Sequence, residues 1–183
     1  MRKLPVALFG LLAWASGLAG VRPGDMAPED LGRTLQEQTI QTSTLRGKVV
    51  VISFWATWCT YCLKELPTLV GLQSVATQRG LPMQVVAVDY EEPRDVFRRS
   101  VKLLQPKLPG LLMTWDRNGS IRKTFDSGDG IPVMVLLHRD GSVAQVLVGY
   151  DESELDDILA RINALLNEPW TPPEASIASP QSP

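Results

Sequence analysis

Two runs in the first half of the chain, one wholly apolar and one mainly apolar, have the pattern of strands buried on two faces. Residues 49–52 are Val-Val-Val-Ile, and residues 83–89 read Met-Gln-Val-Val-Ala-Val-Asp. Between these runs, apolar side chains recur at helical spacing, at Leu63, Leu66, Leu69, Val70 and Val75. A buried strand, a helix and a second buried strand predict a right-handed βαβ unit.

Shorter patterns lie on both sides of this unit. Residues 33–42 alternate around Leu35 and Ile40 and predict a hairpin. A second helix is expected to begin at residues 91–93, and its apolar side consists of Val96, Phe97, Val101 and Leu104. A short strand at 111–115 follows, before a turn at 116–119.

The C-terminal part of the chain predicts a hairpin and a helix. Residues 133–137 and 143–148 are apolar runs separated by Asp140-Gly141, which is a strong hairpin signal. The last helix has the clearest apolar stripe, formed by Leu155, Ile158, Leu159, Ile162, Leu165 and Leu166. Asp151 and Glu154 resemble a capping box at its start.

Composition divides the chain into four parts. Residues 1–19 combine Arg2 and Lys3 with an apolar run at 4–19, the pattern of a signal peptide or an uncleaved membrane anchor. Cleavage is favoured because the run is shorter than the ~20 residues of a spanning helix. Residues 20–30 form a linker, the folded domain is expected at 31–167, and the Pro- and Ser-rich tail at 168–183 is expected to be disordered.

Charge and cysteine content narrow the function. The 183 residues are enough for one domain with a substantial core, and the net charge of −2 gives no reason to expect nucleic acid as a partner. The chain has only two cysteines, Cys59 and Cys62. Any disulfide within the chain must therefore join them, and a separate structural disulfide is excluded.

The two cysteines lie where the first buried strand gives way to a helix. Unpaired N–H groups and the helix dipole favour negative charge at a helix N-terminus, so a thiolate is stabilised there. Two intervening residues place both sulfur atoms on one helical turn, within reach of a disulfide. A thiol of low pKa with a resolving partner beside it is a site of dithiol–disulfide exchange.

Two other uses of the cysteines are less favoured. A zinc site would need two more ligands, and the chain has one histidine, His138, and no second cysteine pair. A purely structural disulfide across so short a loop would remove little entropy from the unfolded chain. A redox role for the cysteine pair is therefore preferred.

Residues 55–67 read Trp-Ala-Thr-Trp-Cys-x-x-Cys-x-x-Glu-x-Pro. This segment resembles the active site of the TlpA/ResA/CcmG-like thiol–disulfide oxidoreductases of the thioredoxin superfamily, and the resemblance extends over about residues 24–167. It implies a thioredoxin-like α/β fold, in which helices flank a mixed central sheet with an N-terminal hairpin and a central insertion. Thr60-Tyr61 departs from the many relatives that have proline before the second cysteine, and this dipeptide tunes the reduction potential.

Position and resemblance together suggest residue roles. Cys59 is nearer the helix N-terminus and is expected to be the nucleophile, with Cys62 as the resolving thiol. Glu65 follows three residues later, on the same helical face as Cys62. In ResA-like proteins a glutamate at this offset affects the protonation of the cysteines, which implies a catalytic role. Spacing alone leaves open a solvated glutamate beside Lys64.

Three further residues are expected to bind the substrate. The resemblance implies that Ile131-Pro132 is a cis peptide facing the cysteines, with Ile131 offering backbone hydrogen bonds to the substrate chain. The residues alone leave open a trans-proline at an edge strand. Trp58 is expected to shield the thiol and to form part of the docking surface. His138 is interpreted as structural or exposed, and Asp89 has no assigned role.

These features predict an extracytoplasmic enzyme, in the periplasm or on the outer face of the plasma membrane, that reduces protein disulfides through the Cys59–Cys62 dithiol. The resemblance implies a disulfide-containing client, as in cytochrome c maturation, and a membrane thiol as electron donor. It implies no dissociable cofactor and no metal, and a tether through residues 4–19 stays open.

Two alternatives remain, one within the enzymes and one among the binding proteins. A peroxiredoxin-like peroxidase would need threonine where Ala56 stands, and a Sco-type copper chaperone would need Cys-x-x-x-Cys and a well-placed histidine.

Overall fold

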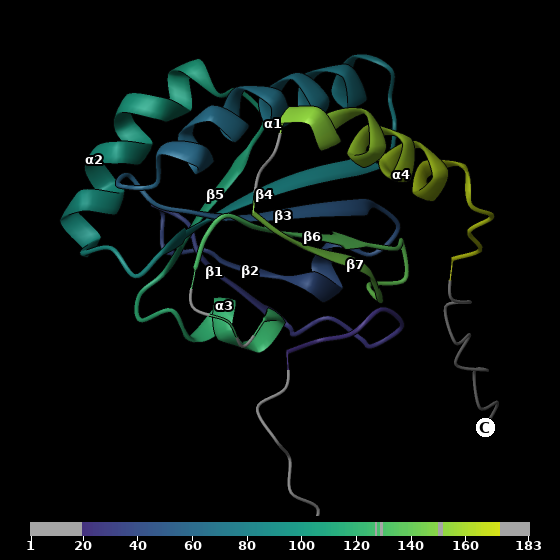
Figure 1. Ribbon diagram of the computed structural model, residues 1–183, viewed down its shortest axis with the longest axis horizontal. Coiled ribbons are helices and arrows are strands. Elements are labelled where there is room, and N and C mark those ends of the chain that lie inside the picture. The colour runs from purple at the N-terminus through teal and green to yellow at the C-terminus, as the bar shows by residue number, and fades with distance from the viewer. Residues whose placement is uncertain (1–19, 127, 129, 150–151, 173–183) are drawn as a thin grey trace, which may run out of the picture.

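A seven-stranded mixed sheet forms the centre of the protein (Figure 1). The computed structural model describes residues 20–172, except 127, 129, 150 and 151. The strands are β1 (Asp30–Arg33), β2 (Thr39–Gln41), β3 (Val49–Trp55), β4 (Met83–Tyr90), β5 (Leu112–Asp116), β6 (Val133–Leu137) and β7 (Val143–Val148). The helices are α1 (Thr60–Gln78), α2 (Arg94–Leu104), α3 (Ser120–Phe125) and α4 (Leu155–Asn167), with short 3-10 turns at Thr42–Leu45, Gln105–Lys107 and Glu152–Glu154.

The strand order is β2-β1-β5-β4-β3-β6-β7. The central strands β3, β4 and β5 run parallel, whereas β6 pairs antiparallel with β3 on one side and β1 pairs antiparallel with β5 on the other. The register aligns Trp55, Asp89 and Trp115 in one row across the parallel strands. The C-terminal ends of β3, β4 and β5 therefore meet at one edge of the sheet, where the active-site loop begins.

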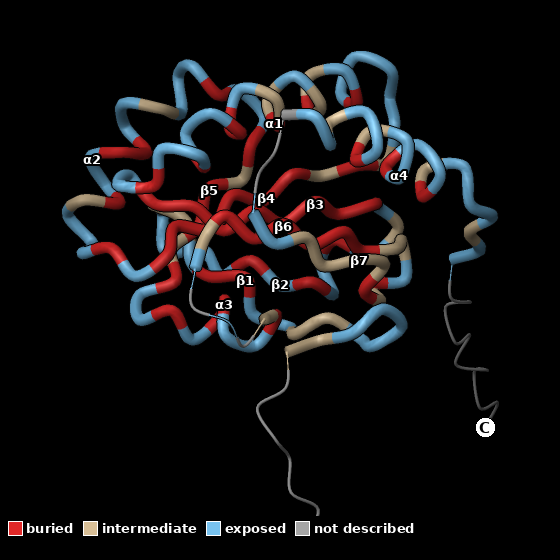
Figure 2. The backbone as a smooth tube through the Cα atoms, in the orientation of Figure 1, coloured by how far each residue is buried: buried red, intermediate tan, exposed pale blue. Residues whose placement is uncertain are grey.

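Helices cover both faces of the sheet, with α1, α2 and α4 on one side and the short α3 on the other (Figure 1). All seven residues of β3 are buried, as expected for a strand covered on both faces. Buried residues concentrate along the central strands, and exposed residues follow the outer sides of the helices (Figure 2). This arrangement confirms the predicted thioredoxin-like α/β fold.

The buried face of α1 differs from the predicted apolar stripe. Leu66 and Leu69 are buried as expected, but Leu63 and Val75 are exposed. The helix instead turns Cys62, Glu65, Gln73 and Ala76 toward the sheet. The buried Gln73 side chain is hydrogen-bonded, because its Oε1 accepts from the Val85 N–H at 2.7 Å.

Two features of the C-terminal half were not predicted correctly. Helix α3 was not expected, because its six residues carry too little periodicity; it is held instead by Asp116, which accepts a hydrogen bond from the Arg122 N–H at 2.9 Å. Helix α4 begins at Leu155, and Glu154 at its N-cap makes no capping bond through its side chain. Asp151, the other half of the expected capping box, lies outside the described residues.

Both predicted extensions contact the folded domain where they are described. In the predicted linker, the Gly24 N–H donates to the Val143 carbonyl at 2.8 Å, and Met26 forms a bridge with Ser142. In the predicted disordered tail, Glu168 contacts His138 at 2.7 Å. Residues 1–19, expected to be a signal or anchor, and 173–183 lie outside the described residues. Within the part of the chain that is described, the helices lack the length and hydrophobicity needed to cross a bilayer.

Candidate redox site

The cysteine pair lies at the start of α1, directly after β3. Cys59 is the N-cap residue of this helix, and its sulfur accepts a hydrogen bond from the Cys62 N–H at 3.1 Å. The two residues form a disulfide, with their Cα atoms 5.2 Å apart. A sulfur at the N-cap of a 19-residue helix faces unpaired N–H groups and the positive end of the dipole, so a thiolate there is stabilised once the disulfide is reduced.

Exposure distinguishes the two sulfur-bearing residues. Cys59 is 6% exposed, whereas Cys62 is fully buried under the helix. A client disulfide can therefore reach Cys59 more readily than Cys62. This difference agrees with the predicted roles of nucleophile and resolving thiol, which remain predictions.

Glu65 lies on the buried face of α1, three residues after Cys62. Its side chain is 2% exposed, which rules out the alternative of a solvated surface glutamate. Burial raises its pKa to about 7, against a smaller opposing effect from the Ser53 hydroxyl, which donates to Oε2 at 3.3 Å. A carboxyl group with this pKa can accept and return a proton near neutral pH.

Two exposed aromatic residues adjoin the cysteines in the chain. Trp58 and Tyr61 are 62% and 61% exposed, and the Lys64 ammonium lies 5.8 Å from the centre of the Tyr61 ring. Exposed aromatic rings of this size are typical of binding surfaces. The docking role of Trp58 remains a prediction, while Trp55 is fully buried in the core.

The Ile131–Pro132 peptide bond is cis, as expected. It directly precedes β6, whose residue Val133 pairs with Phe54 near the end of β3, so this peptide lies at the same edge of the sheet as the cysteine loop. Ile131 is partly buried against two clusters of buried hydrophobic residues in the core. The Pro132 carbonyl accepts a hydrogen bond from the Gly149 N–H at 2.9 Å. Their role in substrate binding remains a prediction.

Sequence reasoning missed a group of polar residues beside the cysteine loop. Glu92 accepts hydrogen bonds from the Thr57 N–H at 2.9 Å and from the Thr57 hydroxyl. Asp89, which had no assigned role, is fully buried at the end of β4. The sequence signal that could have identified this group was Asp89 itself, a carboxylate at the end of a mainly apolar strand.

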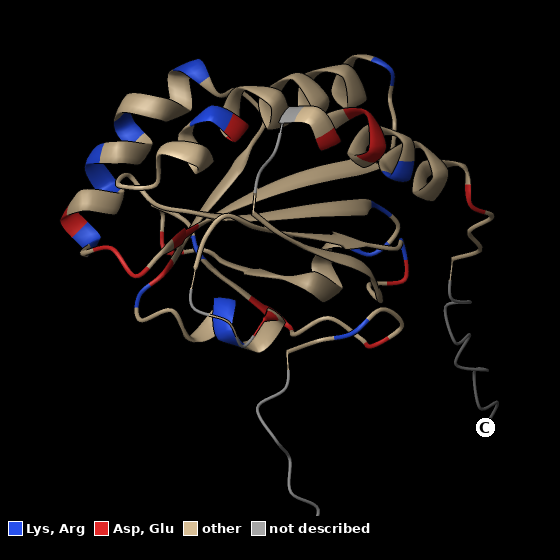
Figure 3. Cartoon of the chain, in the orientation of Figure 1, with Lys and Arg blue, Asp and Glu red and all other residues tan. Residues whose placement is uncertain are grey.

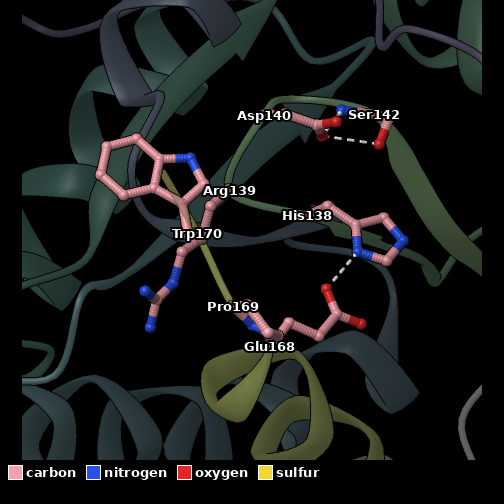
Figure 4. A pocket seen from close by; sticks show the side chains of 7 residues that line it. All are labelled: His138, Arg139, Asp140, Ser142, Glu168, Pro169 and Trp170. Atoms are coloured by element: carbon pink, nitrogen blue, oxygen red, sulfur yellow. Dashed lines mark hydrogen bonds and ion pairs between the residues drawn. The ribbon is translucent and has the colours of Figure 1, made fainter. Parts of the chain in front are cut away.

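A hollow lies at the end of the sheet opposite the cysteine loop, where β6 ends and α4 gives way to the C-terminal segment (Figure 4). It has a volume of about 240 Å³ and lies between the 138–142 turn and residues 168–170. Here His138 has a carboxylate partner that the sequence did not show, because its Nδ1 is 2.7 Å from Glu168 Oε2. Nothing in this hollow reaches the cysteine pair. Across the described residues, no group of three His, Cys, Asp or Glu side chains could hold a metal ion.

Comparison with known proteins agrees with this geometry. The Redoxin family matches residues 22–162. ResA thiol-disulfide oxidoreductases from Bacillus thuringiensis subsp. konkukian and from Bacillus subtilis are 30% and 26% identical to the chain. The first alignment covers 76% of this chain and 78% of the relative, and the second covers 79% and 78%.

A solved structure of a candidate thiol:disulfide interchange protein DsbE from Chlorobium tepidum superposes with a TM-score of 0.69 at 26% identity, covering 80% of this chain and 99% of that one. A thio-disulfide isomerase from Thermus thermophilus gives a TM-score of 0.58 at 30% identity, covering 78% and 97%. The shared fold, the extent of the family match and the cysteine pair at the start of α1 lead to one conclusion. The chain belongs to the Redoxin family, as a ResA-like thiol–disulfide oxidoreductase with the thioredoxin fold.

Proposed function

We propose that the protein works outside the cytoplasm and passes electrons from its Cys59–Cys62 dithiol to a disulfide in a client protein. The observation that carries the proposal is the placement of Cys59 at the N-cap of α1 with Cys62 buried behind it. One sulfur is thereby stabilised as a thiolate that can attack a client disulfide, while the other is held within bonding distance of it.

The reaction consists of two exchanges. The Cys59 thiolate attacks one sulfur of the client disulfide, the client S–S bond breaks, and the departing client thiolate takes a proton. Cys62 then loses its proton and attacks the Cys59 sulfur, which breaks the mixed disulfide and releases the second client thiol. The client gains two electrons and two protons, and the protein is left with the Cys59–Cys62 disulfide present in the structure.

Glu65 is suited to the proton transfer in the second exchange. It shares the buried face of α1 with Cys62, and its pKa of about 7 lies near the pH at which the reaction would run. While Glu65 is ionised, its negative charge raises the pKa of the Cys62 thiol. Once Glu65 accepts the proton of that thiol, the repulsion is removed. We assign Glu65 as the proton acceptor for the resolving thiol.

The reducing direction, the client and the location follow from the resemblance and from the leader-like sequence at 1–19. A disulfide-containing apocytochrome c is the client class that the resemblance implies, with a membrane thiol as the source of electrons. Exposed Trp58 and Tyr61 provide a surface on which an unfolded client segment can dock, with the partly buried Ile131 and the buried Pro132 at the same edge of the sheet.

The test is the equilibrium of the purified protein with glutathione and dithiothreitol buffers, read by alkylation and mass measurement. We expect one two-electron transition at a potential more negative than about −200 mV, in the range of reductants such as thioredoxin. A potential near about −120 mV, typical of a strong oxidant, would contradict the reducing direction. The control is the double variant Cys59→Ser/Cys62→Ser, which should show no transition.

A further inference from the structure

Asp89 is a buried carboxyl group that accepts no well-formed hydrogen bond among the described residues, although the Glu92 N–H approaches it. Its side chain is fully buried, and neither carboxyl oxygen has a partner at normal hydrogen-bond geometry. The sheet register places it between Trp55 of β3 and Trp115 of β5. Because an ionised carboxylate without a well-formed hydrogen bond is very costly at such a position, the group needs either a counter-charge or a proton of its own.

Glu92 connects Asp89 to the loop that carries Cys59. The Glu92 carboxylate accepts both hydrogen bonds offered by Thr57, and its backbone carbonyl accepts the Trp115 Nε1–H at 2.8 Å. The Glu92 side chain also faces the carboxyl group of Asp89. Acidic residues thus gather where β4 and β5 end (Figure 3).

Thr57 occupies a position from which it can control Cys59. It follows Ala56, whose carbonyl accepts a hydrogen bond from the Cys59 N–H at 3.1 Å. The orientation of this turn determines where the Cys59 sulfur lies relative to the first N–H groups of α1. A change in how Glu92 holds Thr57 therefore alters the stabilisation of the Cys59 thiolate.

We propose that Asp89 is a positioning residue that retains a proton and donates it to Glu92, which in turn fixes Thr57 and the loop before Cys59. Two carboxyl groups in contact cannot both be charged without a large penalty. A shared proton removes the repulsion and gives the buried Asp89 oxygens a partner. Burial first, and contact with Glu92 second, raise the pKa of Asp89 to about 9, so the proton is present at neutral pH.

The surrounding charged groups do not replace this proton. Asp116 of β5 adds a further negative charge and accepts its own hydrogen bond from the Arg122 N–H. At the start of α2, Arg94 pairs with Glu37 and lies 5.6 Å from the centre of the Trp115 ring. On α1, Glu65 accepts a hydrogen bond from the Ser53 hydroxyl. Within the described part of the chain, no lysine or arginine forms an ion pair with Asp89 or Glu92.

The first experiment uses the oxidised protein, in which the cysteines do not titrate, and follows the Thr57 backbone amide by NMR from about pH 6 to about pH 10. We expect this amide to shift as Asp89 loses its proton in the alkaline range. The shift should vanish in Asp89→Asn, which keeps an N–H donor and cannot ionise. Asp116→Asn, a matched change at a second buried carboxyl group, should keep the Thr57 shift and move its midpoint to lower pH, because it removes a negative charge that acts on Asp89.

Two outcomes of this experiment would overturn the proposal. One is a Thr57 amide that titrates in Asp89→Asn as it does in wild type. The other is a wild-type Thr57 amide that shows no titration between about pH 6 and about pH 10. The inference rests on the redox role of the cysteine pair, but this titration needs neither client nor turnover. If the titration fails, the proposed function still stands. If the protein proves not to reduce disulfides, the titration result is unaffected.

The second experiment measures how fast the reduced protein is alkylated at Cys59 at neutral pH. Asp89→Ala removes the donor and should slow alkylation by about three- to tenfold, the equivalent of one lost hydrogen bond, whereas Asp89→Asn should restore the rate. If Asp89→Ala does not fold, Thr57→Val removes the hydroxyl contact to Glu92 and should slow alkylation likewise. A wild-type rate in the folded Ala or Val variant would refute the positioning role.

Discussion

Ser53 donates a hydrogen bond from its hydroxyl to Oε2 of Glu65, at 3.3 Å, in the fully buried space between β3 and α1. This contact joins the central strand to the helix behind the cysteine pair. A hydroxyl donor stabilises the charged form of a carboxyl group, so Ser53 holds the pKa of Glu65 lower than burial alone would. The two residues together determine the pH range in which Glu65 can exchange a proton.

Replacing the donor should move this range upward. In Ser53→Ala the Glu65 carboxylate loses its hydrogen bond, so the pKa of Glu65 should rise above its present value of about 7. Carbon-13 NMR of the Glu65 carboxyl in the oxidised protein measures this directly, and Ser74→Ala, on the same helix but remote from Glu65, serves as the control. A Glu65 pKa that stays the same or falls would show that the hydroxyl does not act on the charged form.

Glu65→Gln should stabilise the oxidised protein above neutral pH. Because the folded-state pKa of Glu65 is raised from 4.5 to about 7, the folded protein binds more protons than the unfolded chain between these values. Its stability therefore falls as pH rises through that window, and the glutamine variant escapes the loss. The gain should approach about 3 kcal/mol, since each pKa unit corresponds to about 1.4 kcal/mol.

Urea denaturation of the oxidised protein at several pH values measures this gain, with exposed Asp156→Asn on α4 as the control. The pH–rate profile for reduction of one disulfide substrate tests the same residue in catalysis. The rate of the Glu65→Gln variant should no longer change with pH near neutrality, while the variant keeps its fold. Superimposable profiles for wild type and variant would remove Glu65 from the reaction.

The cysteine variants should trap different products. Cys62→Ser leaves the nucleophile Cys59 but removes the resolving thiol, so it should accumulate a mixed disulfide through Cys59. Cys59→Ser should accumulate far less, because Cys62 is fully buried in the oxidised structure. Mass measurement after reaction with glutathione disulfide identifies the adduct and its position. An adduct that forms mainly on Cys62 would reverse the assignment of roles.

The exposed aromatic residues should affect protein clients and leave small disulfides unaffected. Trp58→Ala should lower kcat/KM for a disulfide-containing polypeptide by about tenfold, because an aromatic anchor at an interface contributes on the order of 1–2 kcal/mol. Reduction of glutathione disulfide should change much less. Leu103→Ala removes a side chain that is 69% exposed on α2 and is the matched control. Equal losses for both substrates would point to an effect on the thiol and not on docking.

The sequence alone was sufficient for the parts of the site that depend on neighbours along the chain. The β-branched run at 49–52 predicted a buried strand, and the change to helical spacing placed Cys59 at a helix start. The interval between Cys62 and Glu65 put both on one helical face. Such inferences succeed because strand and helix periodicity and the ends of helices are local properties of the backbone.

Burial and partners had to come from the tertiary structure. Spacing could not tell whether Glu65 faced solvent; β3 decided this by supplying Ser53, 12 residues away, and by covering the carboxyl group. Thr57 likewise meets Glu92 across 35 residues. The spacing of apolar and polar residues along the chain does not predict such contacts. The pKa of a buried carboxyl group depends on which distant segments exclude water from it and which donors they bring, and these are known only once the sheet and helices have packed.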